Sequence, residues 1–398
     1  NEAIMDLPER FSNLPAYAFP RLRALLDDYP AGGDVLHMSI GEPKHPFPKF
    51  VENILIKSMQ DFNNYPSNDG TPELLSTISN WINKRYGVSL NPENQILSLN
   101  GTREGLFNAQ IALSPETKNG KSTKVLIPNP FYQVYAVGAA TVGAEPVFVP
   151  AYAENNFMPD YSSLPKEVLD QTSILFLCSP ANPQGTMATY DYWAELMRLA
   201  EKHDFKIFAD ECYSEIYRDS APIGALQVAQ DIGADPEKLV VFHSLSKRSN
   251  LPGLRSGFAA SGPKNIFEMK QLRNYSGAPN PTPLQKVATA VWSDENHVIE
   301  NRKLYQKKYQ LADNIFKGVK GYNSPQAGFF LWLPVENGEQ ATLNLWKQAG
   351  IRVLPGSYLS RDVMNRNPGE RYIRVAMVAP FNETKHGLQT IKDNLYTL

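Results

Sequence analysis

The sequence contains little cysteine, with Cys178 and Cys212 the only two among 398 residues. One pair cannot form a disulfide framework, so we expect both to be reduced thiols of a cytoplasmic protein. Long apolar runs are also lacking, since the longest, such as 173–178 and 328–334, fall far short of the ~18 residues of a membrane helix. The N-terminus has neither the basic start nor the apolar core of a signal peptide. We therefore expect no membrane partner.

No charge of one sign predominates, because 39 lysines and arginines face 41 aspartates and glutamates, a net charge of −2. Nucleic-acid-binding proteins usually carry a basic domain or stripe, so we expect no nucleic-acid partner. The six histidines are scattered and the cysteines form no Cys-x-x-Cys, which leaves no metal-ligand spacing. Hydrophobic residues make up 42% of the chain, ample for a large core. These features predict a globular protein large enough to be an enzyme.

Short apolar runs dominate the chain between about residues 95 and 260, and most are separated by stretches long enough for a helix. Buried strands that alternate with helices are typical of a mainly parallel sheet covered on both faces, so we predict a large α/β domain. Towards the C-terminus shorter strands mix with helices, which predicts a smaller α+β domain. The predicted strands of the large domain are Ile96–Leu99, Lys124–Ile127, Pro146–Val149, Ile174–Cys178, Lys206–Ala209, Leu239–Phe242 and Gly257–Ala260.

The most informative stretch runs from Ser244 to Gly257 and directly follows a predicted strand. Lys247 has two hydroxyls before it, on Ser244 and Ser246, and a guanidinium after it, on Arg255. Hydroxyls and a guanidinium can hold a phosphate, and a lysine can form a Schiff base with an aldehyde. A lysine taken alone is more often part of a solvated basic loop.

Two further stretches lie where predicted strands end. Asp210 and Tyr213 follow the strand 206–209, and a carboxylate at the C-terminal end of a parallel strand faces the crevice where such sheets bind ligands. An Asp-Glu pair after a strand is also a common helix N-cap. Asn182 lies in Asn-Pro-Gln-Gly after the strand 174–178, a sequence that by itself is ordinary turn chemistry.

Taken together, these three stretches resemble the cofactor-binding motifs of the class I/II aminotransferases, which depend on pyridoxal 5′-phosphate (PLP). One departure is Ser256, where the family usually has an apolar residue. The resemblance implies the aspartate aminotransferase fold, PLP fold type I, with a mainly parallel seven-stranded sheet. It also implies that residues 1–47 form part of the small domain, 48–285 form the large PLP-binding domain, and 286–398 form the small C-terminal domain.

The resemblance gives each residue of the three motifs a role. Lys247 would bind the cofactor aldehyde, and Asp210 would keep the pyridine nitrogen protonated so that the ring draws electrons. Asn182 and Tyr213 would contact the phenolic oxygen of the cofactor. These contacts would lower the pKa of the Schiff base that the cofactor forms with the lysine. Ser244, Ser246 and Arg255 would hold its phosphate.

Further residues enter the cofactor site by the same resemblance. The turn Gly101-Thr102-Arg103 joins a strand to a helix, where backbone N–H groups and the helix dipole suit a phosphate, although threonine is also a common N-cap. Tyr132 would stack on the pyridine ring; the alternative is an aromatic side chain that only fills the core. Tyr65 resembles the tyrosine that reaches the phosphate of the partner subunit. This implies a homodimer with shared active sites.

An arginine on a predicted strand near the C-terminus indicates the substrate end of the site. Arg374 alternates with apolar residues, and burial of an arginine is costly unless it is paired. A planar guanidinium can bind an α-carboxylate through two hydrogen bonds. The resemblance gives this role to Arg374, with Gly41 and Asn182 beside the same carboxylate.

The predicted reaction is ping-pong amino transfer between an amino acid and 2-oxoglutarate, in which Lys247 moves the proton of the substrate Cα. Longer runs, such as 40–46 and 354–361, resemble the N-succinyldiaminopimelate aminotransferases of lysine biosynthesis. Three alternatives stay open: an aspartate or other amino-acid aminotransferase, a PLP-dependent β-lyase on the same fold, and a non-enzymatic sensor domain.

Overall fold

The computed structural model describes residues 6–277 and 280–397, and its largest element is a seven-stranded sheet. Its strands are β2 (Ile96–Leu99), β5 (Lys124–Asn129), β6 (Glu145–Pro150), β7 (Thr172–Cys178), β8 (Lys206–Asp210), β9 (Leu239–Ser244) and β10 (Gly257–Ser261). They follow the order β2-β10-β9-β8-β7-β5-β6. β10 is antiparallel to both neighbours, and the other neighbours pair in parallel. Each predicted strand is present, so the mainly parallel sheet is confirmed.

Helices cover both faces of this sheet, because successive side chains of each strand point to opposite faces and both sets are apolar. Leu175 and Leu177 of β7 belong to one core, and Ile174 and Phe176 belong to the other. The first core is covered by α3 (Pro72–Tyr86), α7 (Tyr190–His203), α8 (Ala225–Ile232) and α11 (Thr282–Ser293). The second is covered by α4 (Thr102–Leu113), α5 (Gln133–Thr141) and α10 (Pro263–Ser276).

Helix α3 illustrates how the sequence sets the element ends. Thr71 caps its N-terminus by accepting a hydrogen bond from the Leu74 backbone at 3.2 Å, and Pro72 occupies the first turn, where no donor is lost. Gly87 ends the helix in the left-handed conformation, at φ 69°. Between these ends, apolar residues at helical spacing, such as Ile78 and Ile82, are fully buried.

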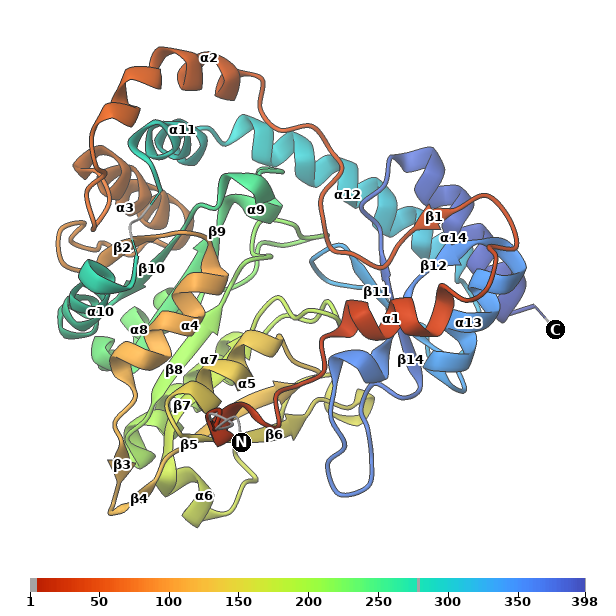
Figure 1. Ribbon diagram of the computed structural model, residues 1–398, viewed down its shortest axis with the longest axis horizontal. Helices are drawn as coiled ribbons and strands as arrows, with labels where there is room; N and C mark the ends of the chain where they lie inside the picture. The colour runs from red at the N-terminus through yellow and green to blue at the C-terminus, as the bar shows by residue number, and fades with distance from the viewer. Residues whose placement is uncertain (1–5, 278–279, 398) are drawn as a thin grey trace, which may run out of the picture.

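A second lobe contains a three-stranded sheet formed by β11 (Phe330–Pro334), β14 (Tyr372–Ala376) and β13 (Leu354–Pro355), in the order β11-β14-β13. The N-terminal strand β1 (Leu36–His37) pairs in parallel with β12 (Ile351–Arg352), so both ends of the chain meet in this lobe. Its helices are α1 (Ala18–Leu26), α12 (Asn296–Ile315), α13 (Gly338–Ala349) and α14 (Phe381–Leu395). Figure 1 shows α12 running from the α11 side of the large sheet to this lobe.

The remaining elements are short. They are α2 (Phe50–Lys57), α6 (Lys166–Gln171), α9 (Leu245–Arg248), β3 (Thr117–Lys118), β4 (Lys121–Ser122), and 3₁₀ turns at Glu9–Phe11, Met59–Asn63, Ala153–Asn155, Pro236–Lys238, Pro252–Leu254 and Gly356–Leu359. Val287, Val291 and Trp292 of α11 pack into the first core of the large sheet. That core therefore continues past residue 285, and the division 1–47, 48–285 and 286–398 stays a prediction.

Candidate active site

The predicted site residues gather at the carboxyl ends of four neighbouring strands. Asp210 ends β8, and Tyr132, Asn182 and Lys247 follow β5, β7 and β9. In a mainly parallel sheet these ends meet along one edge, which is where such sheets bind ligands. Arg374, on β14 of the second lobe, reaches Asn182 from the opposite side at 3.2 Å. The site therefore lies between the two lobes.

Asp210 offers one carboxylate oxygen without a partner. Its Oδ2 accepts a hydrogen bond from Tyr135 Oη at 2.6 Å, while its Oδ1 is buried and receives no hydrogen bond from any described residue. Burial raises the pKa of the Asp210 carboxyl above its ordinary value, although the bond from Tyr135 opposes the rise. A buried acceptor left open in this way fits a cationic N–H donor such as a pyridinium.

Tyr135 was not predicted as a site residue. Its ring stacks on Phe176 of β7 with centroids 4.3 Å apart, which fixes the hydroxyl beside Asp210. Its position three residues after Tyr132 was the available signal, because residues at that spacing share one face of a helix. The two rings meet edge to face, 5.8 Å apart.

Lys247 lies in the short helix α9, which begins at the N-cap Ser244. Its Nζ donates a hydrogen bond to the backbone oxygen of Gly41 and lies 5.6 Å from the centre of the Phe329 ring. Burial, together with the positive charges of Arg374 and Arg255, lowers the pKa of Lys247 to about 8. The amine is thus available as a nucleophile and base close to neutral pH.

The predicted phosphate cradle is brought together by the strand pairing, since Gly257 of β10 pairs with both Leu99 of β2 and Ser244 of β9. Ser244 Oγ accepts a hydrogen bond from the backbone N–H of Ser246 at 3.0 Å and donates one to the Ser246 hydroxyl at 2.9 Å. This turn and the one after β2 are therefore neighbours, and α4 begins at Thr102, directly after the second of them.

Gly101 is required at this point of the cradle. Its φ is 80° and its ψ is 162°, a conformation open almost only to glycine, and a Cβ there would lie 2.2 Å from Arg255 Nη2. Arg255 is held by a 2.9 Å hydrogen bond from its Nη1 to the Pro252 backbone oxygen. Thr102, the first residue of α4, contacts Cys212 Sγ through its hydroxyl at 3.3 Å. A guanidinium, hydroxyls and a helix N-terminus suit a phosphate.

Arg103 contacts the site through Tyr132 rather than through the cradle. Its side chain is exposed, and its Nε donates a hydrogen bond to Tyr132 Oη at 2.8 Å. The contact orients the Tyr132 ring at the carboxyl end of β5. Direct contact between Arg103 and a phosphate stays a prediction.

Arg374 is buried and only partly paired. Its Nη2 donates to the Ser39 backbone oxygen at 2.9 Å and its Nη1 donates to Asn182 Oδ1, while its Nε has no hydrogen-bond partner among the described residues. The guanidinium carbon lies 4.2 Å from the centre of the Phe330 ring, and burial lowers the pKa of Arg374 to about 10. An open buried donor of this kind suits a ligand carboxylate.

The backbone at Gly41 approaches the same place. A Cβ on Gly41 would lie 2.5 Å from Cζ of Phe330, so a larger residue would displace that ring. Tyr213 is buried between the lobes, with its ring centre 5.4 Å from that of Phe329 and 6.0 Å from that of Phe330. Burial raises the pKa of the Tyr213 hydroxyl, which therefore stays protonated and can donate a hydrogen bond.

Tyr65 does not join the other site residues within the chain. Its side chain is fully exposed. The role predicted for it, in the site of a partner subunit, stays a prediction.

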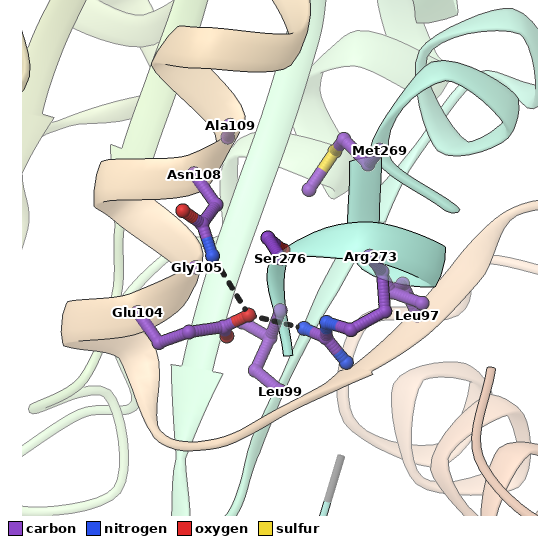
Figure 2. A pocket seen from close by; sticks show the side chains of 9 residues that line it. All are labelled: Leu97, Leu99, Glu104, Gly105, Asn108, Ala109, Met269, Arg273 and Ser276. Carbon is purple, nitrogen blue, oxygen red and sulfur yellow. Dashed lines mark hydrogen bonds and ion pairs between the residues drawn. The ribbon is translucent and has the colours of Figure 1, made fainter. Parts of the chain in front are cut away.

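The small hollow in Figure 2 lies between α4 and α10, beside β2. Arg273 of α10 bridges Glu104 of α4, at 2.5 Å, and the Ser98 backbone oxygen, at 2.9 Å. Glu104 also accepts hydrogen bonds from Asn108 and from the Asn100 backbone. The hollow is no larger than a water molecule, so these contacts fix the first turn of α4 and leave no room for a substrate.

Membrane-spanning helices and metal clusters are both absent from the described residues, 6–277 and 280–397. No helix in these ranges is long and apolar enough to cross a membrane. No group of three or more histidine, cysteine or acidic side chains in them is arranged to hold a metal ion.

The sequence profile of the family "Aminotransferase class I and II" matches residues 33–391. The LL-diaminopimelate aminotransferase of Dehalococcoides mccartyi is 31% identical over 399 residues, covering 96% of this chain and 97% of that protein. An aminotransferase structure from Neisseria meningitidis has 40% identity and a TM-score of 0.90, covering 96% of this chain and 97% of that chain. Aminotransferase AspB from Helicobacter pylori has 34% identity and a TM-score of 0.90, covering 97% of this chain and 100% of that chain.

These comparisons confirm the predicted fold type, enzyme class and cofactor. A probable N-succinyldiaminopimelate aminotransferase from Thermus thermophilus matches at 22% identity with a TM-score of 0.83, covering 95% of this chain and 100% of that chain, which supports the fold alone. The chain belongs to the class I and II aminotransferases and is a PLP-dependent enzyme of fold type I.

Proposed function

We propose that this enzyme transfers the α-amino group of a diaminopimelate-type substrate to 2-oxoglutarate, in the cytoplasm. The observation that carries the proposal is the buried Arg374 guanidinium, whose Nε is open and which lies on the lobe opposite Asp210. Its neighbour Asn182 and the backbone at Gly41 border the same space. One such arginine would bind the α-carboxylate of the amino donor and, in the second half of the cycle, that of the acceptor.

The side chains at the edge of the large sheet would hold the cofactor. When bound, PLP supplies a cationic ring that stabilises negative charge at the substrate carbon bearing the amino group. Asp210 Oδ1 would accept the ring N–H, and Asn182 and Tyr213 would donate to the ring oxygen. Tyr132 would stack on the ring, and the phosphate would be held by Gly101, Thr102, Ser244, Ser246 and Arg255, with Arg103 beside them.

Lys247 would act as the base. Its pKa of about 8 leaves a useful fraction of neutral amine near neutral pH, and its contact with Gly41 holds Nζ beside the proposed carboxylate site. The amine would remove the proton from the substrate Cα and return it on the cofactor side. A β-lyase would begin with removal of the same proton, so the two reactions differ in the step that follows. In amino transfer Lys247 would deliver the proton to the cofactor, whereas in β-elimination a substituent would leave the β-carbon.

The names of the curated relatives support the substrate class. The Dehalococcoides mccartyi relative is an LL-diaminopimelate aminotransferase, and one from Syntrophobacter fumaroxidans is 29% identical over 96% of this chain. The runs 40–46 and 354–361 resemble the N-succinyl-specific enzymes. We therefore propose N-succinyl-LL-2,6-diaminopimelate as the donor, with free LL-diaminopimelate as the second candidate.

We also propose a homodimer with shared sites. Tyr65 is fully exposed, and Ile56, Met59 and Phe62, nearby in sequence, are each at least half exposed. Exposed apolar side chains concentrated in one segment are typical of an interface. The proposed dimer would bring Tyr65 to the phosphate in the partner's site.

A comparison of donors tests the substrate proposal. With 2-oxoglutarate as acceptor, we expect kcat/KM for N-succinyl-LL-diaminopimelate to exceed that for aspartate at least about a hundredfold, or ~2.7 kcal/mol of transition-state discrimination. A preference of that size for LL-diaminopimelate instead would select the second candidate. Equal or better turnover of aspartate would refute the diaminopimelate assignment, and β-elimination without amino transfer would refute the reaction.

A further inference from the structure

Lys308 of α12 is a buried lysine outside the cofactor site. Its side chain is only 1% exposed, and its Nζ contacts three neutral acceptors: Met377 O at 2.9 Å, Ala379 O at 2.6 Å and His45 Nε2 at 2.9 Å. Burial lowers the pKa of Lys308 to about 7, because an ammonium is costly to bury among partners that carry no opposite charge. The three hydrogen bonds of this one buried side chain fix the backbone at Met377 and Ala379 relative to the ring of His45.

His45 connects Lys308 to a chain of further hydrogen bonds. Because Lys308 donates to Nε2, the proton of a neutral His45 lies on Nδ1, which donates to Asn301 Oδ1 at 2.9 Å. Burial and the charge of Lys308 both lower the pKa of His45, so the ring stays neutral. Asn301 Oδ1 also accepts from Asn250 Nδ2 at 3.2 Å, and the same Nδ2 contacts the Pro46 backbone oxygen. We call Lys308, His45, Asn301 and Asn250 the buried clasp.

The clasp holds one end of a loop that borders the proposed substrate site. This loop, residues 39–45, starts just after Met38, whose backbone exchanges hydrogen bonds with Arg352 and Ala376 at 2.8 Å each. It ends at His45. Between these anchors, the Ser39 oxygen accepts from Arg374 and the Gly41 oxygen accepts from Lys247. The clasp is therefore the C-terminal anchor of the backbone that lies against both residues.

Both lobes contribute to the same anchor. Met377 and Ala379 directly follow β14, the strand of Arg374, whereas Asn301 Nδ2 contacts the backbone oxygen of Arg248, the residue after Lys247. An aromatic path runs parallel to it. The Tyr305 ring lies 4.7 Å from that of His45 and 5.6 Å from that of Phe329, the ring beneath Lys247 Nζ. The loop is thus fixed relative to both the arginine and the lysine.

We propose that Lys308 and His45 are positioning residues that hold the loop 39–45 in the conformation that receives the substrate α-carboxylate. The inference rests on the proposed role of Arg374 and Gly41 in binding that carboxylate. Without the clasp, binding must first order the loop, and ordering even a few backbone residues weakens affinity. The loop also accepts the Lys247 hydrogen bond through Gly41, and a bound carboxylate would order the loop and restore that contact. The effect therefore falls on the binding of every carboxylate substrate, and the proton transfer in the bound complex changes little.

The test compares Lys308→Met with Lys118→Met in the holoenzyme. Lys118 is a matched control because its Nζ also donates to three neutral acceptors, the backbone oxygens of Thr172, His203 and Asp204, at 2.6–2.7 Å. Glutarate, a dicarboxylate without an amino group, is the probe, and its Kd is measured by calorimetry. Hydrogen exchange of the loop amides, thermal unfolding, KM for glutamate and 2-oxoglutarate, and kcat complete the measurements.

We expect Lys308→Met to raise the glutarate Kd and both KM values at least tenfold, to speed amide exchange in residues 39–45, and to change kcat less than threefold. Lys118→Met should lower the unfolding temperature and leave the glutarate Kd within twofold of wild type. An unchanged Kd and unchanged loop exchange in Lys308→Met would overturn the inference.

Two substitutions of His45 keep the test decisive if Lys308→Met does not fold. His45→Gln retains an acceptor at the position of Nε2 and should stay near wild type, whereas His45→Asn loses it and should behave as expected for Lys308→Met. Equal glutarate affinity in the two variants would count against the inference. Arg374→Gln separates the premise from the inference, because glutarate binding that survives this change refutes the proposed carboxylate site itself.

Discussion

The two oxygens of the Asp210 carboxylate differ in their hydrogen-bond partners. Oδ2 accepts a hydrogen bond from Tyr135, and Oδ1, which has no partner among the described residues, is the oxygen that we propose for the ring nitrogen. The Tyr135 hydroxyl stabilises the ionised carboxylate against the effect of burial, which by itself raises the pKa of Asp210. We therefore expect Tyr135 to act as a positioning residue that affects the pH dependence of the reaction.

Replacement of Tyr135 by phenylalanine tests this role. Loss of the hydrogen bond raises the pKa of Asp210 further, so we expect the acid limb of the kcat/KM profile to move to higher pH. We also expect kcat/KM at neutral pH to fall roughly tenfold, or ~1.4 kcal/mol, close to the lower end of the contribution of a hydrogen bond to a charged group. Tyr161→Phe is the control, because this buried tyrosine donates to the Phe176 backbone oxygen. An acid limb that moves equally in both variants would contradict the assignment.

Lys247 provides a second prediction at the residue scale. With a pKa of about 8, roughly a quarter of the amine is neutral at about pH 7.5, against about one part in a thousand for an ordinary lysine. In the cofactor-free protein, the rate at which a small aldehyde plus borohydride labels Lys247 should therefore rise with a midpoint near pH 8. Peptide mapping locates the label. A midpoint above pH 10 would show that the folded protein does not lower this pKa.

The sign of the linked stability effect follows from the same shift. The folded pKa of Lys247 lies below the unfolded value of 10.5, so the unfolded chain binds more protons between about pH 8 and 10.5. Within that window the contribution of Lys247 to the free energy of unfolding rises with pH. Below about pH 8 the lysine is charged in both states, and its burial cost is present in full.

At the scale of elements, the turn between β2 and α4 is the one that we propose to hold the phosphate of the cofactor. Gly101→Ala places a side chain in a conformation that costs of order 1–3 kcal/mol, and its Cβ, 2.2 Å from Arg255 Nη2, also displaces that guanidinium. We expect the Kd of PLP, measured by equilibrium dialysis, to rise at least tenfold. Gly120→Ala is the control, since Gly120 has φ 74° and no atom within 4 Å of an added Cβ. Equal PLP affinity in the two variants would contradict the role of this turn.

The large-sheet strands could be predicted because each is apolar on both faces, and unbroken runs such as Ile174–Cys178 are long enough for a strand but short for a helix. The two-residue strand β1 could not, because its pairing with the distant β12 defines it more than its own composition does. The same holds within the site. The motifs identified Lys247, Asp210 and Arg374, but the partner of Lys308 lies 263 residues away in the sequence, at His45, beyond what spacing can indicate.

At the scale of the whole molecule, the large lobe contributes Lys247, Asp210 and Asn182, and the small lobe contributes Arg374 and the loop 39–45. In the proposed function, proton transfer and carboxylate binding therefore fall to different lobes, which meet where Arg374 contacts Asn182. Any change in the angle between the lobes would change the distance from the bound carboxylate to Lys247. Lys308 joins α12 to the segment after β14 through Met377 and Ala379. Asn301 of the same helix contacts the backbone of Arg248 in the large lobe, and this contact opposes such a change.

The proposed homodimer leads to a prediction that a monomer cannot meet. If Tyr65 serves the partner's site, each site takes Lys247 from one chain and Tyr65 from the other. Tyr65→Ala and Lys247→Ala therefore remove residues that two different chains contribute to one site. In a hybrid dimer, the site with an intact Lys247 then receives an intact Tyr65 from the other chain. After the two inactive variants are mixed and refolded, random pairing should restore roughly a quarter of the sites, because half of the dimers are hybrids and each has one complete site. Differently tagged chains, copurified before the assay, establish that hybrids have formed. Hybrids without recovered activity would mean that Tyr65 acts within its own chain or not at all.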